Sequence, residues 1–359
     1  MIDLEVIEWD EFNIAGDNGL FNIFSSTSEI DKKNLYNGGS KKDHTVAYVT
    51  RSGALNGVSM LVDNKQDDKY KKNPGNVITI GLDTQTVFYQ SSPFYTGQNV
   101  HVMTNSKLNK EIAMFIIPIL RIQMGVFGWG GTGATLGRLE RTRVMLPIDE
   151  SGDPAWDVME KYIKQQTSNK KRKYRDYIKK KNKELERHPV PPLDEMEWDT
   201  FFLIDIFDKI QRGKRLIKKN QRPGRTPYVS STGLNNGVAN FLSNEENVRI
   251  FSDCLTIANS GTVGSTFYHP YRFVASDHVT HLKSENMNGY VYLFIATLLN
   301  RLSSKYGFNR EMNDKRIKRE TVILPTTEEG TPDFEYMEQY VINLILDKSN
   351  QYLNNTNMQ

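Results

Sequence analysis

The side chains best suited to a chemical task in this sequence are basic, and they gather in two stretches. Residues 161–187 contain 12 Lys/Arg and 3 Asp/Glu, and residues 209–225 contain 8 Lys/Arg and no acidic residue. The net charge of the whole chain is only +3, so the remaining residues are acidic overall. Concentrated positive charge suits a polyanion such as nucleic acid. The alternative is a solvated helix face followed by a basic loop.

A second group of polar side chains lies in a motif that occurs twice, 180 residues apart. Residues 48–58 read Tyr-Val-Thr-Arg-Ser-Gly-Ala-Leu-Asn-Gly-Val, and residues 228–238 read Tyr-Val-Ser-Ser-Thr-Gly-Leu-Asn-Asn-Gly-Val. A strand that runs into a polar loop closed by Asn-Gly indicates a β-hairpin. Its short hydroxyls, its amides and Arg51 have the size and polarity to contact base edges or phosphates. The alternative is an ordinary hairpin in which Asn-Gly only supplies positive φ.

A longer internal repeat supplies the elements that must position these groups. Residues 146–163 match residues 324–341 at an offset of 178, with eight identical residues. Pro154 suits the first turn of a helix, and apolar residues follow it on one face. No proline follows until Pro189, so this helix is predicted to extend over roughly 34 residues. The second helix is predicted to run from near Pro332 to about Tyr352.

The repeat predicts an α+β fold in which two similar modules are each followed by a long helix. Matching strand-like runs include residues 77–80 against 254–257 and 87–89 against 266–268. Each helix has one apolar stripe, so we expect the two helices to pair antiparallel as a spacer, with pseudo-twofold symmetry. The predicted boundaries are 1–150 and 190–330 for the modules, and 151–189 and 331–359 for the helices.

Patterns that bind cofactors or metals are incomplete. Residues 128–133 have the spacing G-x-G-x-x-G, but they follow a predicted helix and precede a strand, the reverse of a dinucleotide site. His278 and His281 match Asn99 and Val102 of the first module, and no cysteine cluster completes a zinc site. We therefore predict no catalytic, cofactor-binding or metal-binding residue, and strand-surface positions for both histidines.

Length and composition favour a cytoplasmic protein with two or more domains. The 359 residues include one cysteine, Cys254, which cannot form an internal disulfide and fits a reducing compartment. The longest apolar run, residues 112–120, is too short to span a bilayer, and no charged-then-apolar leader begins the sequence. We expect no membrane partner.

Together these motifs resemble the DNA-specificity (S) subunits of restriction–modification systems. The likeness covers essentially the whole chain and lies in Val-Met-Leu-Pro at 144–147 and Val-Ile-Leu-Pro at 322–325, each followed by its long helix. It is greatest to the compact S subunits of type IIB systems within the type I S-subunit family. Residues 131–134 match the family's Gly-rich loop, although the Gln often found there is missing.

The resemblance implies two target recognition domains, each recognising one half of a split sequence in double-stranded DNA without catalysing a reaction. The helices would fix the gap between the halves and dock adenine-N6 methyltransferase subunits, alone or fused to a nuclease. This chain would bind no cofactor, because S-adenosylmethionine and Mg²⁺ would bind to the partners. The stripe residues expected to dock a partner are Trp156, Met159, Ile163, Phe334, Met337, Val341 and Leu344.

We expect arginines to contact guanine and lysines to contact phosphate. The residues expected to contact DNA are Arg51, Ser52, Asn56, Lys41 and Lys42 in the first module, Lys214, Arg215, Lys218, Lys219, Arg222, Arg225, Ser231, Thr232 and Asn235 in the second, and Lys170 and Lys173 on the first helix. For the helix lysines, an acidic partner is the alternative. Two other hypotheses stay open: a stand-alone tandem DNA-binding regulator on the same scaffold, and an enzyme with an unrecognised site.

Overall fold

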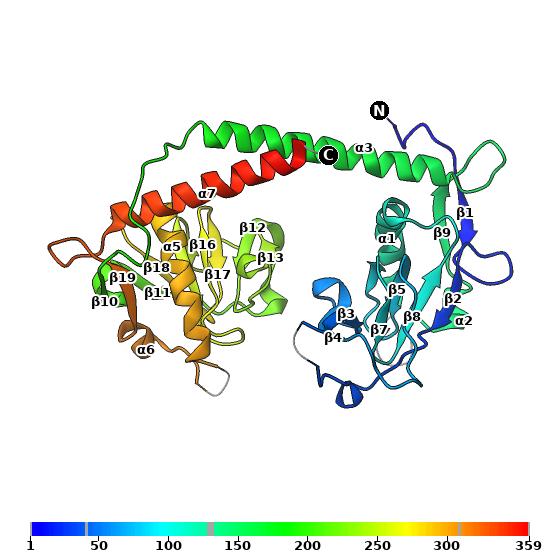
Figure 1. The fold of residues 1–359 in the computed structure, drawn as a ribbon, viewed down its shortest axis with the longest axis horizontal. Coiled ribbons are helices and arrows are strands. Elements are labelled where there is room, and N and C mark those ends of the chain that lie inside the picture. The colour runs from blue at the N-terminus through cyan, green and yellow to red at the C-terminus, as the bar shows by residue number, and fades with distance from the viewer. Residues whose placement is uncertain (1, 40–41, 128–132, 308–309, 358–359) are drawn as a thin grey trace. The chain divides into compact units, whose positions relative to one another are not determined.

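The computed structural model describes residues 2–39, 42–127, 133–307 and 310–357. They form two compact units, Met1–Tyr174 (unit 1) and Arg175–Gln359 (unit 2). Both units are α+β and have the same order of main strands and helices (Figure 1). The division falls inside helix α3 (Trp156–Asn182), because its first half packs on unit 1 and its end lies against the last helix of unit 2.

Unit 1 is built on three small sheets. Its most enclosed strand reads Val-Ile-Thr-Ile-Gly and is buried at all five positions, as expected for a β-branched run covered on both faces. In hydrogen-bonded order, the sheets are β1 (Trp9–Asn13) with β9 (Arg143–Pro147); β2 (Asn22–Ser25), β8 (Val100–Thr104), β5 (Val77–Gly81) and β6 (Val87–Gln90); and β4 (Val58–Asp63), β3 (His44–Val49) and β7 (Phe94–Thr96).

Unit 2 repeats this arrangement with one additional edge strand. The predicted equivalences are confirmed, because Val77 pairs with Gln90 in unit 1 just as Cys254 pairs with His269 in unit 2. In hydrogen-bonded order, the sheets are β10 (Trp198–Phe202) with β19 (Thr321–Pro325); β11 (Lys209–Arg212), β18 (Val279–Lys283), β15 (Cys254–Ala258) and β16 (Thr266–His269); and β13 (Val238–Leu242), β12 (Pro223–Val229), β17 (Phe273–Ala275) and β14 (Ile250–Phe251).

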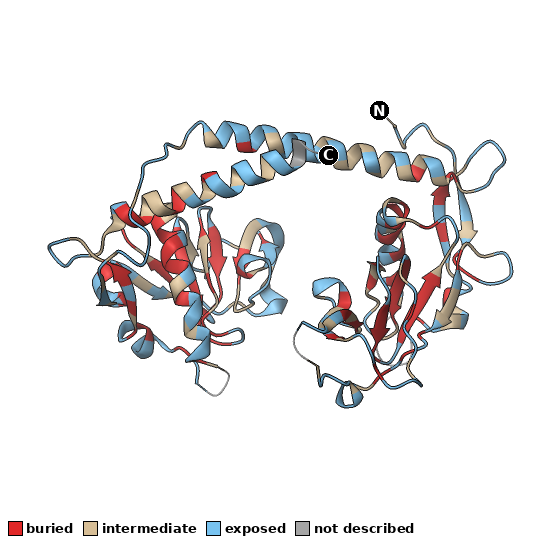
Figure 2. Ribbon diagram, viewed as in Figure 1, coloured by how far each residue is buried: buried red, intermediate tan, exposed pale blue. Residues whose placement is uncertain are grey.

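One helix covers the sheet that contains β5 and β6 in unit 1, and one covers the sheet that contains β15 and β16 in unit 2. These are α1 (Lys110–Met124) and α5 (Gly289–Leu299), and Asn109 and Asn288 cap their first turns through side-chain oxygens. Their buried faces join the strands in the main cores, and Figure 2 shows burial concentrated there. The short helices are α2 (Leu136–Leu139), α4 (Leu203–Ile206), α6 (Asp314–Lys318) and the 3₁₀ turns Lys32–Asn34, Leu55–Gly57, Lys218–Asn220, Asn235–Gly237 and Asn300–Ser304.

The apolar stripe of each long helix faces the helix's own unit. Met159 on α3 and Met337 on α7 (Phe334–Asn357) are both 0% exposed within the main cores. Trp156, Ile163, Phe334 and Val341 also pack there, and a role of these six residues in docking a partner stays a prediction. Met159 and Met337 are fully buried, whereas Trp156, Ile163 and Phe334 are partly exposed. Leu344, which is 45% exposed, keeps that expectation.

Equivalent aromatic trios attach the two long helices to their units. In unit 1, Phe115 lies between Trp9 and Tyr162, with ring centroids 6.2 and 5.9 Å away. In unit 2, the trio of Trp198, Phe294 and Tyr340 repeats this geometry at 6.4 and 5.8 Å. Stacked and edge-on rings at such distances stabilise packing beyond the area they bury. Both helices therefore start from one kind of anchor.

Within unit 2, the end of α3 and the segment after it lie antiparallel to α7. The antiparallel pairing predicted from the sequence is present here, and one face of α7 supplies a row of polar contacts to it. That face repeats at i, i+3 and i+7, as a helical contact surface must. The side-chain contacts are Tyr336 to Pro191, Gln339 to Glu186, Asn343 to His188, Asp347 to Arg187 and Asn350 to Asn182.

Both long helices differ from their predicted lengths. The helix α3 ends at Asn182, whereas the sequence predicted that it would continue to the proline at 189. The helix α7 continues to Asn357, past the predicted end near Tyr352. No helix among the described residues has the length and apolar content needed to cross a membrane.

Candidate nucleic-acid interface

One edge of unit 1 collects the loops that join its strands, at the strand ends away from α3 (Figure 1). Strands β3, β5 and β7 end there, and β4, β6 and β8 begin there. Backbone bonds join the loops: Gly97 N donates to Val49 O (2.9 Å), and Leu82 N donates to Asn99 O (3.0 Å). We call this surface the loop edge of unit 1, and it comprises residues 26–31, 50–57, 82–86, 97–99 and 133–135.

Unit 2 has a loop edge with the same backbone frame. Ser276 N donates to Val229 O (3.0 Å), and Asn259 N donates to His278 O (2.8 Å). These bonds match the two described in unit 1, position for position. The loop edge of unit 2 comprises residues 213–217, 230–237, 259–265, 276–278 and 310–313.

The hairpin tip has one geometry in both units. Asn56 (φ 57°, ψ 30°) and Asn236 (φ 55°, ψ 35°) are both left-handed. Asn56 Nδ2 donates to Tyr89 O (2.8 Å), and Asn236 Nδ2 donates to Tyr268 O (3.3 Å). The prediction of a hairpin whose Asn-Gly supplies positive φ is confirmed. A DNA contact through Asn56 stays a prediction, and this amide already holds the tip against its neighbouring sheet.

In unit 1, three side chains from three loops meet beside the hairpin tip. Arg51 forms an ion pair with Asp83, and Asn99 Nδ2 donates to the same carboxylate oxygen (3.2 Å). The side chain of Arg51 is 41% exposed and that of Asp83 is 23% exposed. A guanidinium held by a carboxylate has a fixed direction, and its remaining N–H donors stay available to a ligand.

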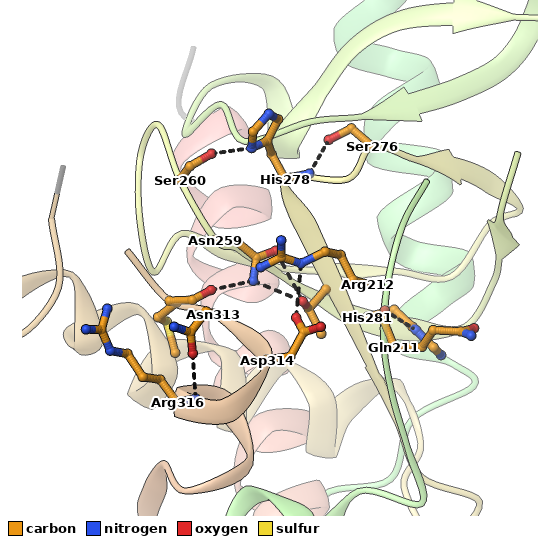
Figure 3. A network of polar contacts seen from close by, with 12 residues as sticks. Gln211, Arg212, Asn259, Ser260, Ser276, His278, His281, Asn313, Asp314 and Arg316 are labelled. Carbon is orange, nitrogen blue, oxygen red and sulfur yellow. Dashed lines mark hydrogen bonds and ion pairs between the residues drawn. The ribbon is translucent and has the colours of Figure 1, made fainter. Parts of the chain in front are cut away.

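In unit 2, the corresponding three positions hold Ser231, Ser260 and His278. His278 Nδ1 lies 2.7 Å from Ser260 Oγ, and the His278 amide donates to Ser276 Oγ (3.2 Å) (Figure 3). Thr262 N donates to Ser231 O (3.0 Å), which brings the hairpin loop against the loop that carries Ser260. The same place on the frame therefore presents different chemistry in the two units.

A buried polar network supports the loops of unit 2 behind this surface (Figure 3). Asn259 is 2% exposed, and its Nδ2 donates to Thr280 Oγ1 (3.0 Å) and to Met312 O (2.7 Å). Next to this buried pair of bonds, a partly exposed ion pair places Arg212 Nε 3.0 Å from Asp314 Oδ1 and connects the end of β11 to α6. Because buried polar groups are costly unless paired, this network fixes the positions of the loops it joins.

The predicted DNA-contact residues of unit 2 divide between two places. Ser231, Thr232 and Asn235 lie in the hairpin loop, and Lys214 and Arg215 follow β11 on the loop edge, where Lys214 N donates to Ala275 O (3.1 Å). The other four predicted contacts are basic residues that lie between the loop edge and β12 or within β12. They are Lys218, Lys219, Arg222 and Arg225. All six basic side chains are exposed, and no ion pair within the described part of the chain engages them.

The remaining predicted contacts are more scattered. Ser52 is exposed on the loop edge of unit 1, where its Oγ accepts a hydrogen bond from Ala54 N (3.1 Å). Lys42 is exposed before β3, at the other end of that strand, and Lys41 lies outside the described residues. Lys170 and Lys173 are exposed on α3. The sequence therefore located the hairpin and the basic loop, while the structure separates the other lysines from the loop edges.

The predicted strand-surface position is wrong for His281. His281 is 5% exposed and stacks on Phe251 of β14, with ring centroids 3.8 Å apart, because this edge strand covers that part of the sheet. Burial lowers the pKa of His281. Within the described ranges, no cluster of three His, Cys, Asp or Glu could hold a metal ion. Of the glycine-rich motif, residues 128–132 lie outside the described residues.

Two units with one loop frame, exposed basic loops and different side chains at matching positions define a tandem nucleic-acid-binding protein. The family model "Type I restriction modification DNA specificity domain" matches residues 7–179 and 195–355. A type II restriction enzyme specificity subunit, S.BcgI from Heyndrickxia coagulans, is 31% identical over 316 residues, which cover 86% of this chain and 88% of that protein. The chain belongs to the family of DNA-specificity subunits of restriction–modification systems.

Solved structures with a similar chain include two S subunits. The type I restriction–modification S subunit from M. genitalium has 15% identity and a TM-score of 0.45, covering 99% of this chain and 94% of that one. The HsdS subunit from Thermoanaerobacter tengcongensis has 14% identity and a TM-score of 0.32, covering 96% and 90%. The family resemblance inferred from the motifs is confirmed by the sequence matches, and with it the role in DNA sequence recognition.

Proposed function

We propose that the chain recognises a split DNA sequence, one half with each unit, and directs adenine-N6 methyltransferase subunits to that site. The partners, alone or fused to a nuclease, would bind S-adenosylmethionine and Mg²⁺ and carry out the chemistry in the cytoplasm. This chain supplies recognition and no catalytic step.

The observation that carries the proposal is the repeated loop edge with different side chains. Sequence is recognised by side chains that contact base edges, whereas backbone contacts only position the protein. Arg51 stands where unit 2 has Ser231, and Leu55 stands where unit 2 has Asn235. Two such surfaces on one chain favour a site with two halves of different sequence.

Exposed positive charge supports DNA as the ligand. Lys214 and Arg215 extend the loop edge of unit 2 with side chains that no described acidic group neutralises. Phosphate contacts from such residues supply affinity and set the salt dependence of binding. Residues 170–173 of α3 are exposed at every position, so this basic stretch is accessible to DNA or to an acidic partner.

The proposal is tested in cells that contain this chain and its cognate methyltransferase, compared with cells that contain the methyltransferase alone. Single-molecule sequencing of the cellular DNA locates methyladenine. We expect one split motif to be methylated only when this chain is present. An active methyltransferase in a soluble complex that leaves no new mark would contradict the proposal. Tight binding of a split site by the purified chain without a partner would then favour the stand-alone regulator.

A further inference from the structure

We propose that one base-recognition site occurs at the same place on both loop edges and makes the two half-sites differ there. In unit 1 the site consists of Arg51, Asp83 and Asn99. In unit 2 it consists of Ser231, Ser260 and His278. The inference rests on the proposed function, since it assigns the loop edges to the DNA.

Backbone hydrogen bonds establish that these positions are equivalent. Leu82, which precedes Asp83, donates its amide to Asn99 O (3.0 Å), and Asn259, which precedes Ser260, donates to the carbonyl of residue 278 (2.8 Å). The hairpin residues 51 and 231 each lie two positions after a carbonyl that accepts from the third loop. The three side chains of each set therefore start from the same points on one frame.

In unit 1, two side chains fix the orientation of an arginine. The carboxylate of Asp83 holds Arg51, and Asn99 donates to that carboxylate (3.2 Å) and so fixes it in turn. Arginine has five N–H donors, and the two parallel donors of its fork match the O6 and N7 acceptors of guanine. We assign Arg51 to a guanine and Asp83 and Asn99 to positioning it.

The set in unit 2 lacks a side chain with two parallel donors. His278 has its Nδ1 at 2.7 Å from Ser260 Oγ and its Nε2 at 4.0 Å from Asp277 Oδ1, and its side chain is 58% exposed, so at most one ring nitrogen can contact a base. A single contact discriminates less than a bidentate pair. Unit 2 should therefore not impose the same strict guanine at the matching position of its half-site.

The test measures the methylated motif produced by variants in the complex with the methyltransferase. We expect Arg51→Ser, the residue of unit 2, to reduce the preference for guanine at one position of one half-site by roughly tenfold to a hundredfold. Arg51→Lys keeps the positive charge but removes the two parallel N–H donors, and should also reduce the preference for guanine at that position. Asp83→Ser should relax that position and no other.

A matched control tests whether any arginine–carboxylate pair gives this effect. Arg272 pairs with Glu245 at 3.2 Å on the surface of unit 2, at the end of β17 away from the loop edge. Arg272→Ser should leave both half-sites unchanged. The converse variant, which carries S231R, S260D and H278N together, should introduce a guanine requirement into the other half-site.

The outcomes separate the two levels of the argument. A wild-type complex that leaves no methylated motif overturns the proposed function, and the inference with it. A wild-type motif that stays unchanged in both Arg51 variants, or weakens uniformly at every position, overturns the inference alone. Relaxation at one position, shared by the Arg51 and Asp83 variants and absent from the Arg272 control, supports it.

Discussion

Mild acid should lower the stability of unit 2, because His269 is buried and uncharged in the folded protein. His269 is 0% exposed, with Nε2 2.8 Å from Thr256 Oγ1 and Nδ1 3.2 Å from Tyr271 OH. Burial lowers the pKa of His269 from 6.5 to about 4. The unfolded chain therefore takes up a proton first, and stability is lost as pH falls from about 6.5 to about 4. At about 1.4 kcal/mol per pKa unit, the full loss approaches about 3 kcal/mol.

Unit 1 supplies the substitution that isolates this effect. Gln90 occupies the position that matches His269, and its Nε2 donates to Thr79 Oγ1 (3.3 Å), as the histidine contacts Thr256. His269→Gln should keep this bond and remove the titration. We expect the variant to match the wild type near pH 7.5 and to exceed its stability at pH 5 by roughly 2 kcal/mol. His188→Gln, at an exposed position, is the control.

Hydrogen exchange read by mass spectrometry resolves unit 2 from unit 1. Peptides from β15 and β16 are compared between wild type and variant at the same pH, so the intrinsic exchange rate cancels. We expect these peptides to be more protected in His269→Gln than in the wild type at pH 5, and equally protected in both at pH 7.5. Equal protection at pH 5, or a gain of the same size in the His188 control, would refute the reasoning.

Five further substitutions test the helices and the charged loop. Met159→Ala and Met337→Ala each remove a fully buried side chain and should destabilise the corresponding unit by roughly 2–5 kcal/mol in denaturant unfolding. Asn343→Ala removes a 2.7 Å bond to the segment after α3 and should cost about 1 kcal/mol, seen as faster exchange in residues 182–191. Lys214→Ala and Arg215→Ala should each lower the slope of log K against log salt for DNA binding by about 0.9, and an unchanged slope would place them away from phosphate.

The strands and hairpins were predictable because the chain contains its own comparison. Residues 77–80 and 254–257 share Thr and Ile at matching positions, and each run is followed by a strand that contains Phe-Tyr, so their match predicted equivalent strands. The structure gives both pairs the same register. The repeat also located the start of each long helix to within two residues, because α3 and α7 begin two positions after Pro154 and Pro332. It could not show that Asn182 ends α3, because lysine and asparagine at that point permit helix or coil.

The apolar stripes gave less information about contacts, because periodicity shows that a face is covered and not what covers it. The apolar spacing around Met159 and Met337 is the same whether the helix packs on its own unit or on another protein. The polar face of α7 gave a weaker signal, since Gln339 and Asn343 are also common on solvated helices. Gln339 and Asn343 are uncharged although they lie on a helix beside a basic segment, and this is the signal that could have indicated a contact surface.

The partners of Arg51 were missed for a different reason. Asp83 and Asn99 lie 32 and 48 positions farther along the chain, and only the folded sheets bring them to the hairpin. The sequence comparison of Asn99 with His278 counted against a metal site. The same difference marks a place where the two units diverge, and divergence on a common frame indicates specificity.

The magnitudes explain how such positions can differ without changing the fold. The Arg51–Asp83 pair is partly exposed, and ion pairs of that kind contribute about 0–1 kcal/mol to stability. A bidentate contact with guanine contributes roughly 1–3 kcal/mol to discrimination between bases. The loops are held in place by backbone hydrogen bonds and by the side-chain amides of Asn56 and Asn236. None of these bonds uses the side chain of residue 51 or 231. Under the proposed function, we expect substitution at these positions to change recognition more than stability, so that each unit could have its own half-site on a shared scaffold.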